Sequence, residues 1–139
     1  MEEKRILAID YGEKRIGLAI TDPLRIFPYP LTTILNNNFL FDELKKVFNE
    51  YLIELVLIGY PLKESGEKSR IIDQIEKFES KIKTVFDVKT EFVDERYSSE
   101  IAKQMILETV PSKKKRRDKS LVDKNAAFVM LQDYLNSIK

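Results

Sequence analysis

Apolar residues along this chain form two patterns, short unbroken runs and longer stretches with helical spacing, and together these predict an α/β fold. Unbroken or alternating runs predict strands at residues 5–10, 16–21, 55–58 and 85–93. The run at 55–58 has the continuous apolar character of a strand buried on both faces. Residues 31–35 predict a further strand at the edge of the sheet, because prolines precede them and sheet edges tolerate proline.

Between these strands, apolar residues recur every three or four positions. This spacing predicts helices at residues 39–52, 67–83 and 120–137. Asn38 is expected to cap the first of these helices. Another helix is expected to open at Ser98 and to end at Pro111. The predicted order of elements is therefore β-β-β-α-β-α-β-α-α.

This order predicts a mixed five-stranded sheet with helices on both faces. The first two strands are expected to pair antiparallel, because a short turn at residues 11–14 joins them. The later strands are expected to be parallel, because helices connect them. The chain has 139 residues and neither an internal repeat nor a long linker, so we expect one domain over residues 1–139.

Composition narrows the class of protein. Hydrophobic residues make up 43% of the chain and charged residues 34%, which suits a folded globular protein. The chain has no cysteine, which excludes disulfides, thiolate metal sites and thiol nucleophiles. No apolar stretch approaches the ~20 residues of a membrane span, and no signal peptide is visible at the start. We therefore expect a cytoplasmic protein with no membrane partner.

Three acidic residues, far apart in the sequence, occupy places that an α/β fold could bring together. Asp10 closes the apolar run of the first strand, Glu95 follows the strand predicted at 85–93, and Asp123 lies at the start of the last helix. Sites in open α/β sheets form at the carboxyl ends of strands. Clustered carboxylates repel one another and need a cation. Because the chain has neither histidine nor cysteine, that cation is expected to be Mg²⁺ or Mn²⁺, held by oxygen ligands.

Each acid taken singly has an ordinary structural explanation. An Asp that ends a strand before a glycine is commonly a turn residue, as Asp10 could be. Asp94 could be the functional acid in place of its neighbour Glu95. Asp123 could simply complement the helix dipole.

Positive charge is concentrated in one segment although the formal net charge is only +1. Five consecutive cations precede the last predicted helix: Lys113, Lys114, Lys115, Arg116 and Arg117. Such a run is most often a solvated loop, and it can also present a phosphate-binding surface.

Four ordered motifs resemble those of the YqgF family, to which Holliday-junction resolution or nuclease action on precursor ribosomal RNA is ascribed. The motifs are Asp-Tyr-Gly-Glu-Lys-Arg-Ile-Gly-Leu-Ala at 10–19, Val-Leu-Ile-Gly-Tyr-Pro-Leu at 56–62, Asp-Glu-Arg-Tyr-Ser-Ser at 94–99 and Asp-Lys-Asn-Ala-Ala at 123–127. Tyr60 stands where an aliphatic residue is usual. The resemblance covers nearly the whole chain.

The resemblance implies a ribonuclease H-like fold in which Asp10, Glu95 and Asp123 are the catalytic and metal-binding carboxylates. It implies divalent-metal-dependent hydrolysis of structured nucleic acid, with the precursor of 16S ribosomal RNA as the expected substrate and branched DNA as the alternative. The resemblance also implies the ribosome as a further partner. A resolvase would favour a two-fold dimer, and the sequence shows no dimer surface, so we expect a monomer or a weak homodimer.

Further residues are expected to support such a site. Gly12 and Gly17 would let the backbone approach a phosphate closely or simply form the turn. The remaining candidates are cations expected to contact phosphates: Lys14, Arg15, Arg96, Lys113, Lys114, Lys115, Arg116 and Arg117.

Two functions of other classes remain open on the sequence. A non-catalytic ribosome-associated or RNA-binding factor would need the basic segment but not all three acids. An actin-like ATP-binding phosphotransferase shares the Asp-x-Gly pattern after the first strand. Such proteins need two domains around ATP, and the later motifs of this chain fit them poorly.

Overall fold

The computed structural model describes residues 4–61, 70–94 and 119–138, and describes side chains in the last range only from residue 126 onward. Five strands form one sheet in the order β3-β2-β1-β4-β5. The strands are β1 (Arg5–Tyr11), β2 (Arg15–Thr21), β3 (Pro28–Leu35), β4 (Ile53–Tyr60) and β5 (Lys89–Asp94). β1 pairs antiparallel with β2, and β2 with β3, whereas β4 lies parallel to both β1 and β5. The predicted mixed sheet is confirmed.

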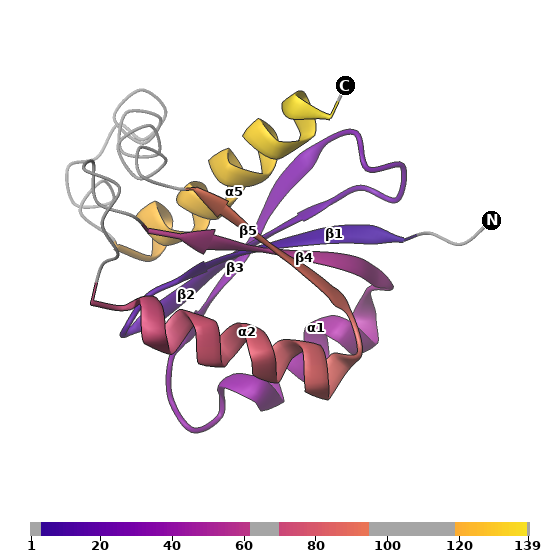
Figure 1. The fold of residues 1–139 in the computed structure, drawn as a ribbon. Helices are drawn as coiled ribbons and strands as arrows, with labels where there is room; N and C mark the ends of the chain where they lie inside the picture. Colours follow the sequence, from indigo (N-terminus) through magenta and orange to yellow (C-terminus); the bar gives the residue numbers. More distant parts are fainter. Residues whose placement is uncertain (1–3, 62–69, 95–118, 139) are drawn as a thin grey trace.

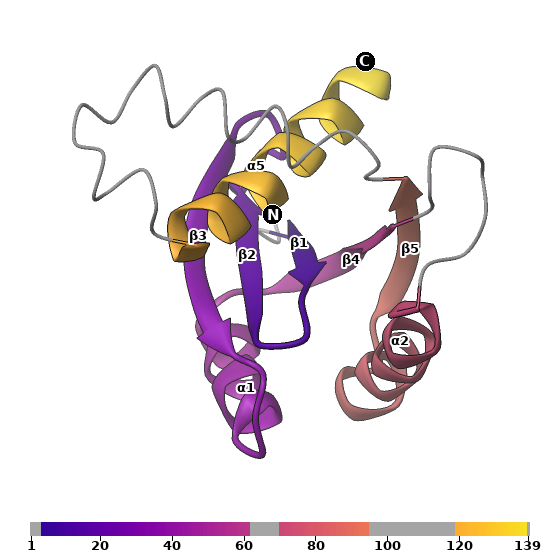
Figure 2. The same ribbon diagram turned by 90° about the vertical axis from the view of Figure 1, so that its left-hand side faces the viewer.

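Helices cover both faces of this sheet, as predicted. α1 (Leu40–Glu50) and α2 (Ile72–Phe86) lie on one face, and α5 (Lys119–Ser137) crosses the other (Figure 1). Seen from the edge where β1, β4 and β5 end, the sheet separates α5 from the two other helices (Figure 2). The helix predicted from Ser98 lies outside the described residues. None of the described helices is long and apolar enough to cross a membrane.

Two apolar cores follow from the alternation of side chains along the strands. The larger core lies under α1 and α2 and is built from branched aliphatic residues together with stacked aromatic rings. Phe48 of α1 stacks on Phe86 of α2 with ring centroids 3.9 Å apart. The smaller core lies under α5 and contains several alanines, namely Ala8, Ala19 and Ala127.

Several boundaries differ from the sequence-based prediction, and contacts in the structure explain two of these differences. Asn38 does not cap α1, because the helix begins one residue later than a cap at that position requires. Instead, the Oδ1 of Asn37 accepts a hydrogen bond of 2.9 Å from the Phe39 amide. The strand predicted at 85–93 begins only at Lys89, since α2 continues to Phe86. The stacking of Phe86 on Phe48 holds this last turn helical, and Asp87 then ends it with a positive φ of 50°.

Thr21 is the one polar residue buried in the described core. Its Oγ1 accepts a hydrogen bond of 3.0 Å from the Ile6 amide, and its carbonyl accepts one of 3.2 Å from Nη1 of Arg5. These bonds join the start of β1 to the end of β2. They satisfy a backbone donor that burial would otherwise leave without a partner.

Replacing Thr21 by valine keeps the shape of the side chain and removes this acceptor. The free energy of unfolding is expected to fall by about 1–3 kcal/mol, because the Ile6 amide loses its partner in a buried position. Chemical denaturation measures the change. Thr32→Val on the exposed part of β3 is the matched control, with an expected change within about 0.5 kcal/mol. Equal effects of the two substitutions would contradict the role given to Thr21.

Candidate active site

Strand alternation places Asp10 on the α5 face of the sheet. Within β1, Leu7 and Ile9 belong to the core under α1 and α2, whereas Ile6 and Ala8 belong to the core under α5. Successive side chains on a strand point to opposite faces, so Asp10 continues the series of Ile6 and Ala8. It is half-buried and lies one residue before the end of β1, at the carboxyl edge that was predicted for it.

Glycines occupy the neighbouring strand positions on both sides of Asp10. Gly17 of β2 is its direct antiparallel partner. On the other side, Ile9 pairs with Ile58 of β4, which places Asp10 level with Gly59. The expected role of Gly17 in the turn is therefore wrong, because it lies inside β2. Gly59 is a site neighbour that the sequence did not reveal, since only the strand register brings it there.

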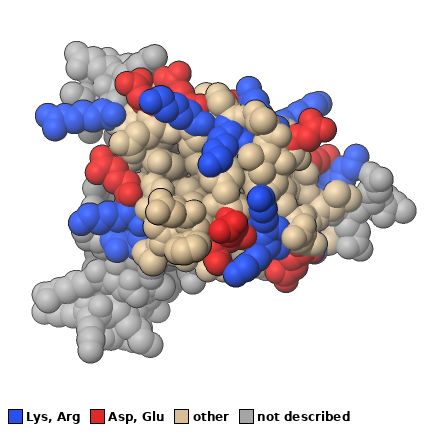
Figure 3. All heavy atoms as spheres, turned by 90° about the horizontal axis from the view of Figure 1, so that it is seen from below, with Lys and Arg blue, Asp and Glu red and all other residues tan. Residues whose placement is uncertain are grey.

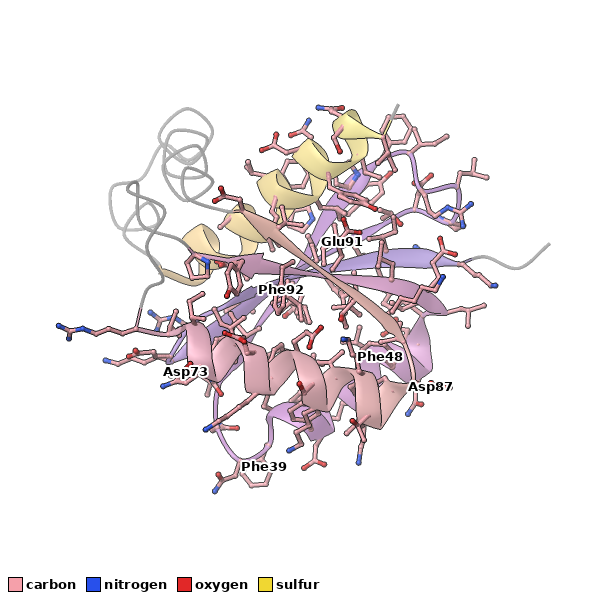
Figure 4. The ribbon with its side chains drawn as sticks, in the orientation of Figure 1. Phe39, Phe48, Asp73, Asp87, Glu91 and Phe92 are labelled. Atoms are coloured by element: carbon pink, nitrogen blue, oxygen red, sulfur yellow. The ribbon has the colours of Figure 1, made fainter. Side chains whose placement is uncertain are left out.

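Alternation also separates the two acids at the end of β5. Glu91 lies on the α5 face, where its Oε2 accepts a hydrogen bond of 3.4 Å from the Tyr134 hydroxyl. Phe92 lies on the opposite face (Figure 4), and its ring centroid lies 4.8 Å from that of Tyr60. Asp94 follows Phe92 by two residues and so shares the face away from Asp10. Glu95 lies outside the described residues.

The last helix brings a second candidate acid toward the same edge. Ala127 is fully buried in the core that contains Ala8 and Ala19. These two residues pair with each other on β1 and β2, next to the Asp10–Gly17 pair on the same face of the sheet. Asp123 precedes Ala127 by four residues, so the two positions lie on the same face of the helix. The start of α5 lies at the edge where β1 ends (Figures 1 and 2). The side chain of Asp123 itself lies outside the described residues.

Tyr134, in the C-terminal half of α5, contacts Glu91 of β5. Burial, together with the negative charge and the hydrogen-bonding oxygen of Glu91, raises the pKa of the Tyr134 hydroxyl above its ordinary value. The proton therefore stays on the phenol through neutral pH, and the hydroxyl remains the donor. This contact links α5 to β5, the strand that leads to Glu95.

The turn after Asp10 has a defined shape. Gly12 is required there, because a Cβ at this position would collide with the carbonyl oxygen of Arg15. Asn36, which directly follows β3, holds the turn with two hydrogen bonds. Its side-chain Nδ2 donates to the Gly12 carbonyl at 2.8 Å, and its backbone N–H donates to the Lys14 carbonyl at 2.9 Å. Lys14 is exposed and Arg15 is half-buried beside the turn. Asn36 is a further residue that local sequence patterns did not indicate.

Several predicted site residues lie outside the described residues. Among the described residues, no group of three acidic side chains is arranged to hold a metal ion. That search does not cover Glu95 or the side chain of Asp123. The remaining candidates outside the described residues are all cations: Arg96, Lys113, Lys114, Lys115, Arg116 and Arg117.

The α1 and α2 face carries no concentrated positive charge on its described residues. Lysines and arginines alternate there with acidic side chains (Figure 3). α1 has three acidic and two basic residues, and α2 has three of each. Because phosphate attraction needs an excess of positive charge, this face is a poor surface for nucleic acid.

Two hollows on the described part of the surface also lie away from Asp10. One, of about 430 Å³, runs between β3 and α1 and includes Phe39. The other, of about 470 Å³, lies at the start of β4 and β5 and includes Asp87 (Figure 4). Neither is lined by Asp10, so the candidate site rests on the strand ends and not on these hollows.

Comparison with known proteins identifies the family. The model of the RuvX family, described as Holliday junction resolvase, matches residues 4–137. The chain belongs to the RuvX family. This match spans all four motifs noted in the sequence.

Curated relatives agree with this assignment over nearly their whole length. A Flavobacterium psychrophilum protein is 47% identical over 132 residues, covering 94% of this chain and 96% of the relative. A Flavobacterium johnsoniae protein is 44% identical over 134 residues, covering 96% of each. Both carry the provisional name of pre-16S rRNA nuclease.

The fold has a counterpart among solved structures. The fowlpox virus resolvase, solved in complex with substrate Holliday junction DNA, superposes with a TM-score of 0.56. The match covers 96% of this chain and 98% of the viral protein, at 16% identity. It confirms the ribonuclease H-like architecture that the sequence resemblance implied.

Packing of α5 on the small residues of β1 and β2 can be tested by enlarging Ala127. Ala127→Leu is expected to lower the free energy of unfolding by about 1–3 kcal/mol, because the fully buried position has no room for a larger side chain. Gln132→Leu, at an exposed position of the same helix, should change it by less than about 0.5 kcal/mol. Thermal and urea unfolding followed by circular dichroism measure both. An Ala127→Leu protein as stable as the parent would contradict this packing.

Proposed function

We propose that this protein is a nuclease that hydrolyses phosphodiester bonds in the precursor of 16S ribosomal RNA. Family membership and the names of the relatives support the reaction and the substrate. The observation that carries the site is the position of Asp10, at the carboxyl edge of the sheet and on the face that α5 covers. We assign Asp10, Glu95 and Asp123 as the catalytic carboxylates.

Helix and strand geometry supports the inclusion of Asp123. Four residues of helix advance about 6 Å, and two residues of strand advance about 6.6–6.8 Å. Ala127 and Ala8 lie in the same buried core, and one helical turn back from Ala127 is similar in length to the step from Ala8 to Asp10. A carboxylate at position 123 is therefore suitably placed to act together with Asp10.

Strand alternation supports Glu95 over Asp94. Asp94 belongs to the face of Phe92, where α2 packs, whereas Asp10 belongs to the face of α5. Glu91 and Val93 alternate toward the α5 face, and residue 95 is the next position in this series. The family resemblance points to the same residue.

The donor set fits a divalent cation of the Mg²⁺ or Mn²⁺ class. Asp10 supplies a half-buried carboxylate, and the chain contains neither histidine nor cysteine, so only oxygen ligands are available from ionised side chains. When bound, such an ion supplies an activated water and neutralises charge on the phosphate. The three carboxylates of Asp10, Glu95 and Asp123 would hold it.

Cations of the chain supply the attraction for the substrate. Lys14 and Arg15 stand beside the turn that follows Asp10. Arg96 and the basic segment of residues 113–117 adjoin Glu95 and Asp123 in the sequence. Contacts to phosphates dominate nucleic-acid affinity, so these cations are assigned to substrate binding. Resolution of branched DNA is the second candidate, which the family description favours.

Asp10→Asn tests the assignment, because it removes the charge and keeps the size of the side chain. With Mg²⁺ or Mn²⁺ present, cleavage of a radiolabelled 16S precursor transcript is expected to fall on the order of 10²–10³-fold. Asp73→Asn, on the exposed start of α2 (Figure 4), is the control and should cleave within about twofold of the parent. A four-way DNA junction assayed in parallel distinguishes the two substrates.

Two outcomes would overturn parts of this proposal. Undiminished cleavage by the Asp10→Asn protein would refute the site. Restoration of 16S maturation in depleted cells by a variant without cleavage activity would favour a non-catalytic binding factor.

Asp94→Asn and Glu95→Gln form a matched pair that tests the assignment by alternation. Glu95→Gln is expected to reduce cleavage as strongly as Asp10→Asn, because a ligand is lost. Asp94→Asn should reduce it less than about tenfold, because its side chain lies on the other face of β5. Rates of cleavage of the same transcript measure both, and the reverse ranking would show that Asp94 is the catalytic acid.

A further inference from the structure

A shallow hollow lies between α1 and α2, beside the end of β1. It has a volume of about 270 Å³, and its aromatic and polar lining residues are Tyr11, Phe41, Gln74, Lys77, Phe78 and Lys81. Tyr11 is the last residue of β1, and Gln74 follows Asp73 in the first turn of α2, at the edge where β1 ends (Figure 4). The hollow therefore lies at the carboxyl edge of the sheet, on the face opposite to that of Asp10.

Three aromatic rings line this hollow and contact one another. The ring centroid of Phe78 lies 4.9 Å from that of Tyr11 and 5.8 Å from that of Phe41. Phe78 is buried, whereas Tyr11 and Phe41 are only partly buried and present ring surface to the hollow. Exposed aromatic rings are the platforms on which unpaired bases stack. The hollow therefore suits a planar aromatic group.

The cations of the hollow have no acidic counterpart among its lining residues. Lys77 and Lys81 are exposed and lie one helical turn apart, and neither forms an ion pair with a described residue. Nζ of Lys81 lies 4.1 Å from the Phe41 ring centroid, which places positive charge beside that ring. The two larger hollows are lined by acids as well as lysines. This hollow is thus a local exception on a face whose charges otherwise alternate in sign.

An aromatic wall beside unpaired lysines favours a ligand that combines a planar ring with negative charge, as a nucleotide does. The volume of about 270 Å³ is below the roughly 300–1,000 Å³ of pockets that hold whole drug-sized ligands, so the hollow suits a single base. The face as a whole lacks the excess of positive charge that a duplex needs. A nucleotide outside a duplex, by contrast, exposes the faces of its base for stacking.

We propose that the hollow between α1 and α2 binds an unpaired nucleotide of the RNA substrate, with its base against Tyr11 and Phe41 and its phosphates near the two lysines. The inference rests on the proposed nuclease function, which supplies the substrate. Consecutive Cα atoms are about 3.8 Å apart, so Tyr11 joins the hollow to Asp10 through one peptide bond. An RNA strand that crosses the carboxyl edge of the sheet can reach both. The hollow thereby favours RNA that is unpaired beside the cleavage point.

The test compares two aromatic variants of α1. Phe41→Leu removes a ring that lines the hollow, whereas Phe48→Leu removes a ring that stacks on Phe86 outside it. Binding of a short single-stranded RNA in EDTA is measured by fluorescence anisotropy. Phe41→Leu is expected to weaken binding about 5–10-fold and Phe48→Leu less than about twofold, because only the first loses base stacking. The melting temperatures of both variants should fall to a similar extent, since each loses one stacked ring.

Lys77→Gln and Lys81→Gln test the charges of the hollow, with Lys45→Gln on the exposed side of α1 as the matched control. Each of the first two is expected to weaken binding about threefold and the control less than about 1.5-fold, because only the lysines of the hollow contact phosphate. A fully paired duplex of the same sequence should bind the parent and Phe41→Leu proteins equally, since its bases cannot enter the hollow.

Equal binding of the single-stranded RNA by the parent and Phe41→Leu proteins would overturn the inference. Equal losses in the Phe41→Leu and Phe48→Leu proteins, or an equal loss with the duplex, would also overturn it. Binding in EDTA requires no cleavage, so these results are separate from the Asp10→Asn assay. Failure of the hollow leaves the nuclease proposal standing, and undiminished cleavage by Asp10→Asn leaves the binding result standing.

Discussion

The close contact between α5 and the small side chains of β1 and β2 is the constraint on which the candidate site depends. Ala127 is buried in the same core as Ala8 and Ala19, and these small side chains let the helix approach the sheet more closely than large residues would allow. This contact fixes the height of the helix above the strand that ends in Asp10. Because Asp123 lies one turn before Ala127, the same contact sets how near the two acids can come.

Local sequence patterns predicted the strands and helices well where the apolar pattern of a segment matches the element that it forms. The unbroken apolar run of β4 and the helical stripe of α1 are examples. The boundary between α2 and β5 was predicted wrongly, because the stacking of Phe86 on Phe48 extends the helix through residues whose local pattern favours a strand. That contact joins two helices distant in sequence, and no local window contains it.

In the candidate site, too, local patterns indicated some residues and long-range contacts determined the others. Asp10 could be recognised as an acid at a strand end, and Asp123 as an acid at a helix start. The choice between Asp94 and Glu95 could not be made from spacing, and only the family resemblance indicated Glu95. The structure adds a physical reason in the opposite faces of Glu91 and Phe92. Gly59 could not be found from the sequence, because its position beside Asp10 follows from parallel pairing across a crossover.

The two faces of the sheet carry different side chains at the end of β1, and neighbouring residues of this strand link them. Tyr11 points into the aromatic core, where its ring centroid lies 4.9 Å from that of Phe78. Its neighbour Asp10 points to the opposite face, where Gly17 is its strand partner on β2 and Gly59 lies level with it on β4. Anchoring Tyr11 fixes the backbone at the end of the strand and thereby the direction of the carboxylate. Rigid supporting contacts of this kind keep a functional group in place before its ligand arrives. Burial under α1 and α2 therefore stabilises the end of the strand from which Asp10 faces α5.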